Sequence, residues 1–392
     1  MMKTNDRVKA FSFEGGLYEV FQMALELEAN GRSIIHMEIG KPDFDSPNIA
    51  KEAVKKALDE GMVHYTAMAG IMPLREAITN KYKRDHGLEY DPKTEIIVTA
   101  GACEAIGVAM LALMNPGDEI LVPSPYFPAY LEQAIIADVK LVEVPLKMEN
   151  NFSLKVEDLA SRVTDKTKII LINTPHNPTG AIIEKKDLEK IAKLAIEKDL
   201  IVISDETYDQ FIFNGKHFSI ASIEGMKERT IVINSASKTF SMTGWRIGYA
   251  MGPAHIIKYL NKTHQNFSTC ATSFAQAGAA EAYNNGEDFI QDMLKEFKRR
   301  GELVYNKLSE IDGVKVLEPK GAFYVFPNIE GIGMEENEFC KYILEEAGVA
   351  IVPGNSFGEY GKGFVRICYA CSYEQIEDAM NRIKKAVEKI KK

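Results

Sequence analysis

The segment "TIVINSASKTFSMTGWRIGYA", residues 230–250, joins an apolar run to a lysine in an unusual setting. The run at 230–233 predicts a buried strand, and Lys238 follows it among small polar residues. Lysine is rarely buried unless it is paired or takes part in chemistry. From this segment alone, Lys238 could be a solvated loop residue, a phosphate ligand or a reactive amine.

Similar apolar runs recur along the first two thirds of the chain and alternate with helical stretches. They are "EIIVTA" from 95, "EILVPS" from 119, "KLVEVP" from 140, "KIILINT" from 168, "LIVISDE" from 200 and "TIVINS" from 230. Several are continuous in Ile, Val and Leu, which is typical of parallel strands covered on both faces. The sequence therefore predicts an α/β fold with a mostly parallel sheet between helices.

The pattern changes near residue 290, where a long amphipathic helix is followed by shorter strand-like runs. We expect strands at 314–319, 321–328 and 363–370, then a last helix capped by Ser372 and Gln375. We therefore predict a large domain at 47–288 and a smaller α+β domain made of 1–46 and 289–392.

Composition excludes some classes of function. The net charge of −9 and the alternation of lysines with acids argue against nucleic-acid binding. The N-terminal segment lacks the apolar core of a signal peptide, and no apolar run is long enough to span a membrane. We expect a cytoplasmic protein.

The cysteines and histidines do not predict a metal centre. Five cysteines spread over 392 residues form no disulfide framework. Cys368 and Cys371 form a CxxC pair, but a zinc site needs further ligands at similar spacing, and their surroundings are apolar. We expect both to be core thiols and expect no metal.

Polar residues follow the ends of three neighbouring strands. These residues are Asn177 in "TPHNPTG" after one strand, Asp205 and Tyr208 after the next, and Ser235, Lys238 and Arg246 after the third. Ligands bind beyond the carboxyl ends of the strands in such sheets. The sequence therefore predicts one site that contains an amide, a carboxylate, a phenol and two cations.

Nearly the whole chain resembles the class I and II aminotransferases, which are pyridoxal-phosphate enzymes of fold type I. The resemblance is carried by "HMEIGKPDF", "YTAMAGIMPLREAI", "NTPHNPTG", "DETYDQF", "SASKTFSMTGWRIGY" and "VPGNSFGEYGKGFVRICYA", in this order. It implies a large cofactor-binding domain, a smaller domain and transfer of an amino group.

The resemblance also implies roles for the strand-end residues. Lys238 would form a Schiff base with the cofactor aldehyde and later move the α-proton. Asp205 would pair with the pyridine nitrogen and keep it protonated. Asn177 and Tyr208 would hydrogen-bond the phenolic oxygen of the ring. Glu206, beside Asp205, is expected to be structural.

Further cofactor contacts follow from the same resemblance. The backbone N–H groups of Ala102 and Cys103, at a predicted helix start, would face the phosphate with Ser235 and Arg246. Phe127 would stack on the pyridine ring. Tyr65 would reach the phosphate from a partner subunit, which implies a homodimer with shared active sites.

For the substrate, Arg366 would bind the α-carboxylate and the backbone of Gly40 would close over it. Aspartate-preferring relatives carry a lysine where this chain has Cys103, so the resemblance leaves open aspartate, alanine, aromatic or broad donors, with 2-oxoglutarate as a 2-oxo acid partner. One alternative is a carbon–sulfur β-lyase of the same fold. Another is a non-enzymatic, ligand-sensing domain.

Overall fold

The computed structural model describes residues 5–7, 9 and 16–390, and within them the largest sheet has seven strands. Their order is β2-β8-β7-β6-β5-β3-β4. The strands are β2 (Ile96–Thr99), β3 (Glu119–Ser124), β4 (Lys140–Pro145), β5 (Thr167–Asn173), β6 (Ile201–Asp205), β7 (Thr230–Ser235) and β8 (Gly248–Met251). The six strands expected from the sequence are confirmed. The sequence analysis missed β8, which runs antiparallel to β2 and β7, whereas the other pairs are parallel.

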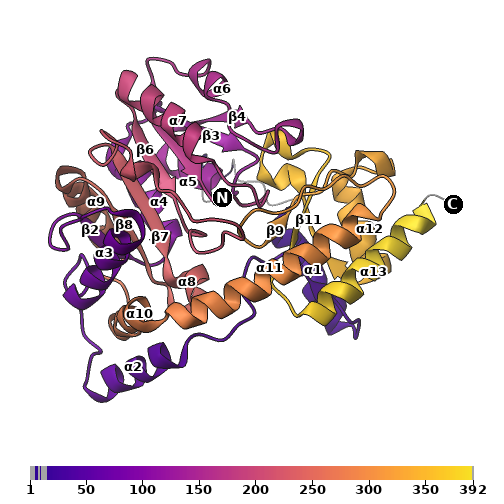
Figure 1. Ribbon diagram of the computed structural model, residues 1–392, viewed down its shortest axis with the longest axis horizontal. Helices are drawn as coiled ribbons and strands as arrows, with labels where there is room; N and C mark the ends of the chain where they lie inside the picture. Colours follow the sequence, from indigo (N-terminus) through magenta and orange to yellow (C-terminus); the bar gives the residue numbers. More distant parts are fainter. Residues whose placement is uncertain (1–4, 8, 10–15, 391–392) are drawn as a thin grey trace.

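Helices cover both faces of this sheet (Figure 1). They are α3 (Met72–His86), α4 (Ala102–Leu113), α5 (Ala129–Ala137), α6 (Val156–Ala160), α7 (Lys185–Glu197), α8 (Ala236–Thr239), α9 (Ala254–Phe267) and α10 (Ser273–Asn285), and α2 (Asn48–Asp59) packs against α10. Successive strand residues point to opposite faces: Ile203 packs with α4, α5 and α9, whereas Val202 packs with α7. The continuous apolar runs are explained by this two-sided burial.

The C-terminal part forms smaller sheets. In one, β12 (Val365–Cys368) pairs antiparallel with β11 (Val352–Pro353) and β9 (Tyr324–Val325). In another, β1 (Ile35–His36) pairs with β10 (Val349–Ala350). The remaining helices are α1 (Leu17–Ala29), α11 (Glu287–Ser309), α12 (Glu336–Ala347) and α13 (Tyr373–Ile390). Short 3-10 turns lie at 148–150, 220–222, 243–245, 330–332, 354–357 and 359–361.

Two strand predictions in this part were wrong in extent. Segment 314–319 is not a strand, because it makes only a single bridge, from Lys315 to Asn328. The strand expected at 321–328 is reduced to β9, since Ala322 has a left-handed φ of 55° and Pro327 lacks an N–H donor. The predicted cap is confirmed: Ser372 and Gln375 exchange side-chain to backbone hydrogen bonds before α13.

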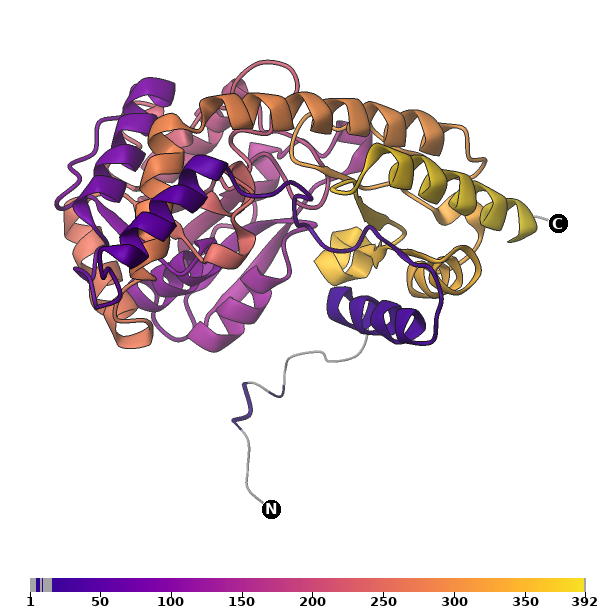
Figure 2. The same ribbon diagram turned by 90° about the horizontal axis from the view of Figure 1, so that it is seen from below.

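A separate apolar cluster packs α11, α12 and α13 against β9 and β12. Cys368 and Cys371 are buried in it as free thiols, as predicted. Figures 1 and 2 show α11 running from α10 along the molecule to α13. This helix therefore extends along both the large sheet with its helices and the C-terminal cluster. The predicted domain limits at 47 and 288 stay a prediction, and 1–4, 8 and 10–15 of the N-terminal segment lie outside the described residues.

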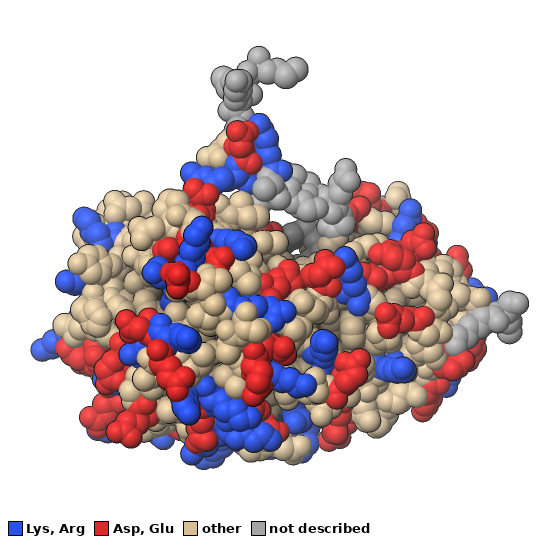
Figure 3. All heavy atoms as spheres, turned by 90° about the horizontal axis from the view of Figure 1, so that it is seen from above, with Lys and Arg blue, Asp and Glu red and all other residues tan. Residues whose placement is uncertain are grey.

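The surface has mixed charge. Figure 3 shows acidic and basic side chains interspersed over most of one face. Among the described residues, no helix is long and apolar enough to cross a membrane. In the same residues, no cluster of three or more His, Cys, Asp or Glu side chains could hold a metal ion.

Candidate active site

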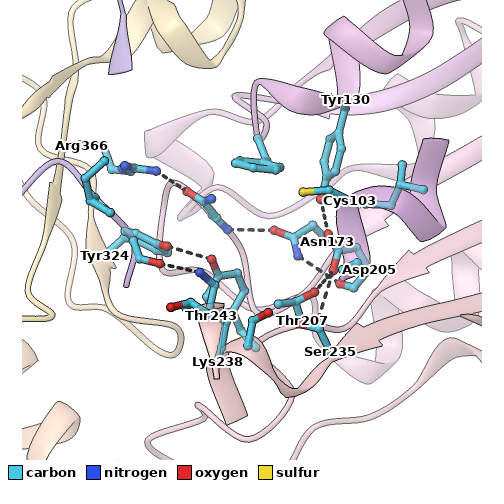
Figure 4. A pocket seen from close by; sticks show the side chains of 18 of the residues that line it. Cys103, Tyr130, Asn173, Asp205, Thr207, Ser235, Lys238, Thr243, Tyr324 and Arg366 are labelled. Carbon is cyan, nitrogen blue, oxygen red and sulfur yellow. Dashed lines mark hydrogen bonds between the residues drawn. The ribbon is translucent and has the colours of Figure 1, made fainter. Parts of the chain in front are cut away.

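A pocket of about 340 Å³ lies where the carboxyl ends of β5, β6 and β7 meet the start of α4 (Figure 4). Segments outside the large sheet complete its wall, with Gly40 after β1, Tyr324 on β9 and Arg366 on β12. The predicted site residues that line it are Gly40, Ala102, Cys103, Phe127, Asn177, Asp205, Tyr208, Ser235, Lys238, Arg246 and Arg366. Tyr65 is not among the described residues of the lining, and the residue is 85% exposed.

Lys238 lies on α8, a single helical turn that follows β7 directly. Its Nζ donates a 2.5 Å hydrogen bond to the carbonyl oxygen of Gly40, and it forms no ion pair with any described residue. Burial lowers the pKa of Lys238 to about 8, and the positive charges of Arg366 and Arg246 act in the same direction. About a tenth of this amine is therefore neutral and nucleophilic at pH 7, far more than for an unperturbed lysine.

Asp205 is the last residue of β6 and is buried. Tyr130 Oη donates to its Oδ2 at 2.6 Å, and the hydroxyl of Thr207 donates to Oδ1 at 2.6 Å. Burial raises the pKa of Asp205, while the Thr207 and Tyr130 hydrogen bonds oppose this effect. The carboxylate is thus held in one orientation, and a cationic group in the pocket would stabilise its ionised form.

The start of α4 forms an anion-binding corner. Gly101 precedes the helix with a φ of 88°, and a Cβ there would lie 2.4 Å from Nη2 of Arg246. Arg246 itself has a left-handed φ of 57° and donates to the carbonyls of Ala100 and Thr243. Free N–H groups at a helix start favour anions. Ser235 lines the same corner.

Arg366 is almost fully buried, with 2% exposure. Its Nη1 donates to Oδ1 of Asn177 at 3.1 Å and its Nη2 donates to the carbonyl of Glu38, but its Nε has no hydrogen-bond partner among the described residues. The guanidinium lies 4.8 Å from the ring centres of Tyr324 and Phe357. A buried cation without an acidic partner is costly, so this geometry favours an anionic ligand.

Two aromatic pairs shape the pocket. The hydroxyls of Tyr208 and Tyr324 lie 2.8 Å apart, and a Cβ on Gly40 would collide with Tyr324 Oη. Phe127 packs edge-on against Tyr130, with ring centres 5.7 Å apart. These contacts restrict the orientations of Tyr208 and Phe127 in the lining.

Sequence reasoning missed several residues of this site. Tyr130 and Thr207 hold Asp205, and Asn173 donates to its carbonyl while accepting from the N–H of Asn177. Tyr324 contacts Tyr208. Thr207 and Asn173 stand next to strand ends, which could have marked them. Tyr130 carried no such signal, because an apolar helix such as α5 gives no sign of which aromatic residue bears a functional hydroxyl.

Known proteins place the chain in a family. Residues 32–383 match the family described as aminotransferase class I and II. The chain is 42% identical to aromatic-amino-acid aminotransferase 2 of Thermococcus litoralis, over 100% of both chains. It is 46% identical to the aspartate aminotransferase of Pyrococcus abyssi, over 93% of this chain and 95% of that one.

Solved structures agree. The aspartate aminotransferase of Thermus thermophilus with maleate superposes with a TM-score of 0.93 at 37% identity, covering 98% of this chain and all of that one. An aromatic aminotransferase from Pyrococcus horikoshii gives 0.89 at 46% identity, covering 94% and 99%. The chain therefore belongs to the class I and II aminotransferases. It has their fold and is an aminotransferase, which confirms the function predicted from the sequence.

Proposed function

We propose that pyridoxal 5'-phosphate binds in this pocket and that the protein transfers amino groups from neutral or aromatic L-amino acids to a 2-oxo acid such as 2-oxoglutarate. The observation that carries the proposal is that a neutralisable lysine, an oriented carboxylate and two arginines without acidic partners among the described residues line one pocket. When bound, the cofactor supplies an aldehyde for the amine and a ring that withdraws electrons from the substrate.

The residues present fit this cofactor. The phosphate would take the corner made by the α4 N-terminus, Ser235 and Arg246, where Gly101 keeps the backbone accessible. The buried carboxylate of Asp205 would accept the ring N–H. Asn177 and Tyr208 would hydrogen-bond the phenolic oxygen, and Phe127 would cover one face of the ring.

The chain's own groups account for the chemistry. Lys238 Nζ, with its pKa of about 8, would hold the aldehyde group of the cofactor; once the substrate amine has displaced it, the freed amine could take the proton from the substrate α-carbon. Arg366 would bind the α-carboxylate through its free Nε and its Nη atoms. Arg366 and Lys238 lie on different elements and line the same pocket. Arg366 would act on the α-carboxylate and Lys238 on the proton of the same α-carbon.

The charged residues of the pocket lining indicate which substrate side chains would fit. The lysines and arginines among the described lining residues are Lys238, Arg246 and Arg366, and the proposal gives each a partner. Cys103 stands where the resemblance would place a lysine for a distal carboxylate, and this exposed residue lines the pocket. Ile39, Ile106 and Phe127 add apolar surface. A neutral or aromatic side chain would thus be bound without leaving a charge unpaired.

The cofactor site is tested by covalent labelling. Apoprotein loaded with pyridoxal 5'-phosphate and reduced with borohydride should carry the label on the peptide that contains Lys238, as read by mass spectrometry. Lys238→Ala should lose the label and the transamination, whereas Lys262→Ala, at an exposed position on α9, should keep both. A label on another lysine of the wild-type protein would overturn the assignment.

We also propose a homodimer in which Tyr65 contacts the phosphate bound by its partner. Support comes from the exposure of Tyr65 together with neighbouring exposed apolar residues, Val63 and Met68. Inactive Lys238→Ala and impaired Tyr65→Phe proteins should be mixed after mild dissociation. If Tyr65 acts across the interface, one site of each hybrid is intact and activity rises above that of either parent. No rise would place Tyr65 in its own subunit's site or outside any site.

A further inference from the structure

The turn at 205–209 presents its side chains to two sides. Asp205, Thr207 and Tyr208 line the pocket, whereas Glu206 and Asp209 are not part of the lining and their side chains are fully buried. Two buried carboxylates directly behind a cofactor site are costly unless each is paired. The groups that contact Glu206 and Asp209 therefore show how the turn is held in place.

Glu206 is held by four groups. The hydroxyls of Ser204 and Ser219 donate to its Oε1 at 3.0 and 2.6 Å, and Tyr82 Oη donates to Oε2 at 3.4 Å. His217 Nε2 lies 3.2 Å from Oε2, a contact that lacks the geometry of a hydrogen bond. Burial alone would raise the pKa of Glu206, but His217 and the hydrogen bonds lower it below its usual value. Glu206 is thus an ionised and fully oriented group.

Asp209 anchors the other end of the turn. Lys81, a buried residue of α3, pairs with its Oδ2, and Gln210 donates to the same oxygen at 3.0 Å. Burial acts to raise the pKa of Asp209, but the charge of Lys81 brings it to about 2. The backbone N–H of Asp209 also donates to the carbonyl of Glu206. The two residues are thus linked through the backbone, and their carboxylates are fixed to α3 and to the loop after β6.

We propose that Glu206, held by His217, is a positioning residue that orients Asp205 toward the cofactor ring. The inference rests on the proposed role of Asp205. The two residues are adjacent on one strand end, so a shift of the Glu206 side chain moves the backbone that carries Asp205. The hydroxyls of Ser204, Ser219 and Tyr82 donate to the Glu206 carboxylate, so this side chain is fixed on the side of the turn that faces away from the pocket.

A double-mutant cycle tests this inference. The dissociation constant of pyridoxal 5'-phosphate from the apoprotein is measured by quenching of protein fluorescence for the wild type, His217→Gln, Asp205→Asn and the double variant. His217→Gln should weaken binding about tenfold in the wild-type background but less than about twofold when Asp205 is already Asn, because residues in one network couple. An equal loss in both backgrounds would show a merely structural effect and overturn the inference.

The same cycle separates the two proposals. If Asp205→Asn does not weaken cofactor binding, the proposed function of Asp205 fails. If it does, and the His217 effect is unchanged, only the positioning role fails. His255→Gln, at an exposed histidine on α9, is the matched control and should bind as the wild type does.

A comparison of two Glu206 variants separates a loss of positioning from a loss of folding. Glu206→Gln keeps an oxygen for the serine hydroxyls, whereas Glu206→Ala removes every contact. Positioning through hydrogen bonds predicts that Glu206→Gln retains most of the affinity that Glu206→Ala loses, with thermal unfolding of each apoprotein recorded in parallel. Equal affinity in the two variants would contradict the positioning role.

Discussion

Tyr130 Oη and Asp205 Oδ2 lie 2.6 Å apart, and both side chains are buried. Hydrogen bonds to charged groups contribute about 1.5–3 kcal/mol. Since this bond lowers the pKa of Asp205, Tyr130→Phe should raise it further. The apoprotein should then lose stability as pH rises through the titration of Asp205, with little loss below it. Urea unfolding on both sides of that titration checks this.

The matched control for this prediction is Tyr259→Phe, which changes an exposed hydroxyl on α9 and should leave stability unchanged at both pH values. A Tyr130→Phe protein with the wild-type pH profile would show that Thr207 alone orients the carboxylate.

The low pKa of Lys238 predicts a pH dependence with a defined sign. Its pKa of about 8 in the folded protein lies below the value of about 10.4 for an unperturbed lysine. Between these values the unfolded chain binds more protons, so the unfolding free energy of the apoprotein should increase as pH rises. Lys238→Met should lack this increment. The rate at which apoprotein binds pyridoxal 5'-phosphate should rise through about pH 8, as stopped-flow absorbance would show; a flat profile would contradict a neutral nucleophile.

The residue at position 103 is expected to set the preference for acidic over neutral amino donors. Cys103→Lys would add a cation at the start of α4, and a charge-assisted hydrogen bond contributes about 1.5–3 kcal/mol. The ratio of kcat/KM for aspartate over alanine should rise roughly ten- to a hundredfold. Cys103→Met, which adds no charge, is the control. Strong aspartate selectivity in the wild type, unchanged by the lysine, would mean that another residue binds the distal carboxylate.

Arg366 should matter equally for all amino donors. Arg366→Lys replaces a bidentate donor with a single ammonium group, so kcat/KM should fall on the order of a hundredfold for every donor, while the ratio between donors stays within about twofold. Steady-state rates with alanine, aspartate and phenylalanine provide the comparison. A loss confined to aspartate would show that Arg366 contacts the side chain instead of the α-carboxylate.

The parts of the structure that the sequence predicted are those with local signals. Two-sided burial gives continuous apolar runs, and polar residues at strand ends give the site, so Asp205, Ser235 and Lys238 were found together. Strand β8, which lies between β2 and β7, was missed because "GYAM" is short and follows the functional loop that ends at Arg246.

Other features depend on contacts between distant segments. The hydrogen bond from Tyr130 to Asp205 joins residues 75 positions apart, and no local pattern records it. The ion pair of Lys81 with Asp209 joins residues 128 positions apart, and in the sequence Lys81 is one of many helix lysines. Such pairings follow from the order of strands in the sheet, which hydrophobic periodicity does not specify.

Helix α11 affects the distance between the two side chains that would bind the amino group and the α-carboxylate of a substrate. Its 23 residues span about 34 Å as one uninterrupted rod that packs beside α10 at one end and α13 at the other. Lys238 belongs to the sheet side of this rod and Arg366 to the C-terminal side, yet an amino group and its α-carboxylate are separated by one carbon atom. The length of the helix therefore fixes the distance between the two substrate contacts. Inserting or deleting a few of its residues would misalign Lys238 and Arg366 without changing either residue.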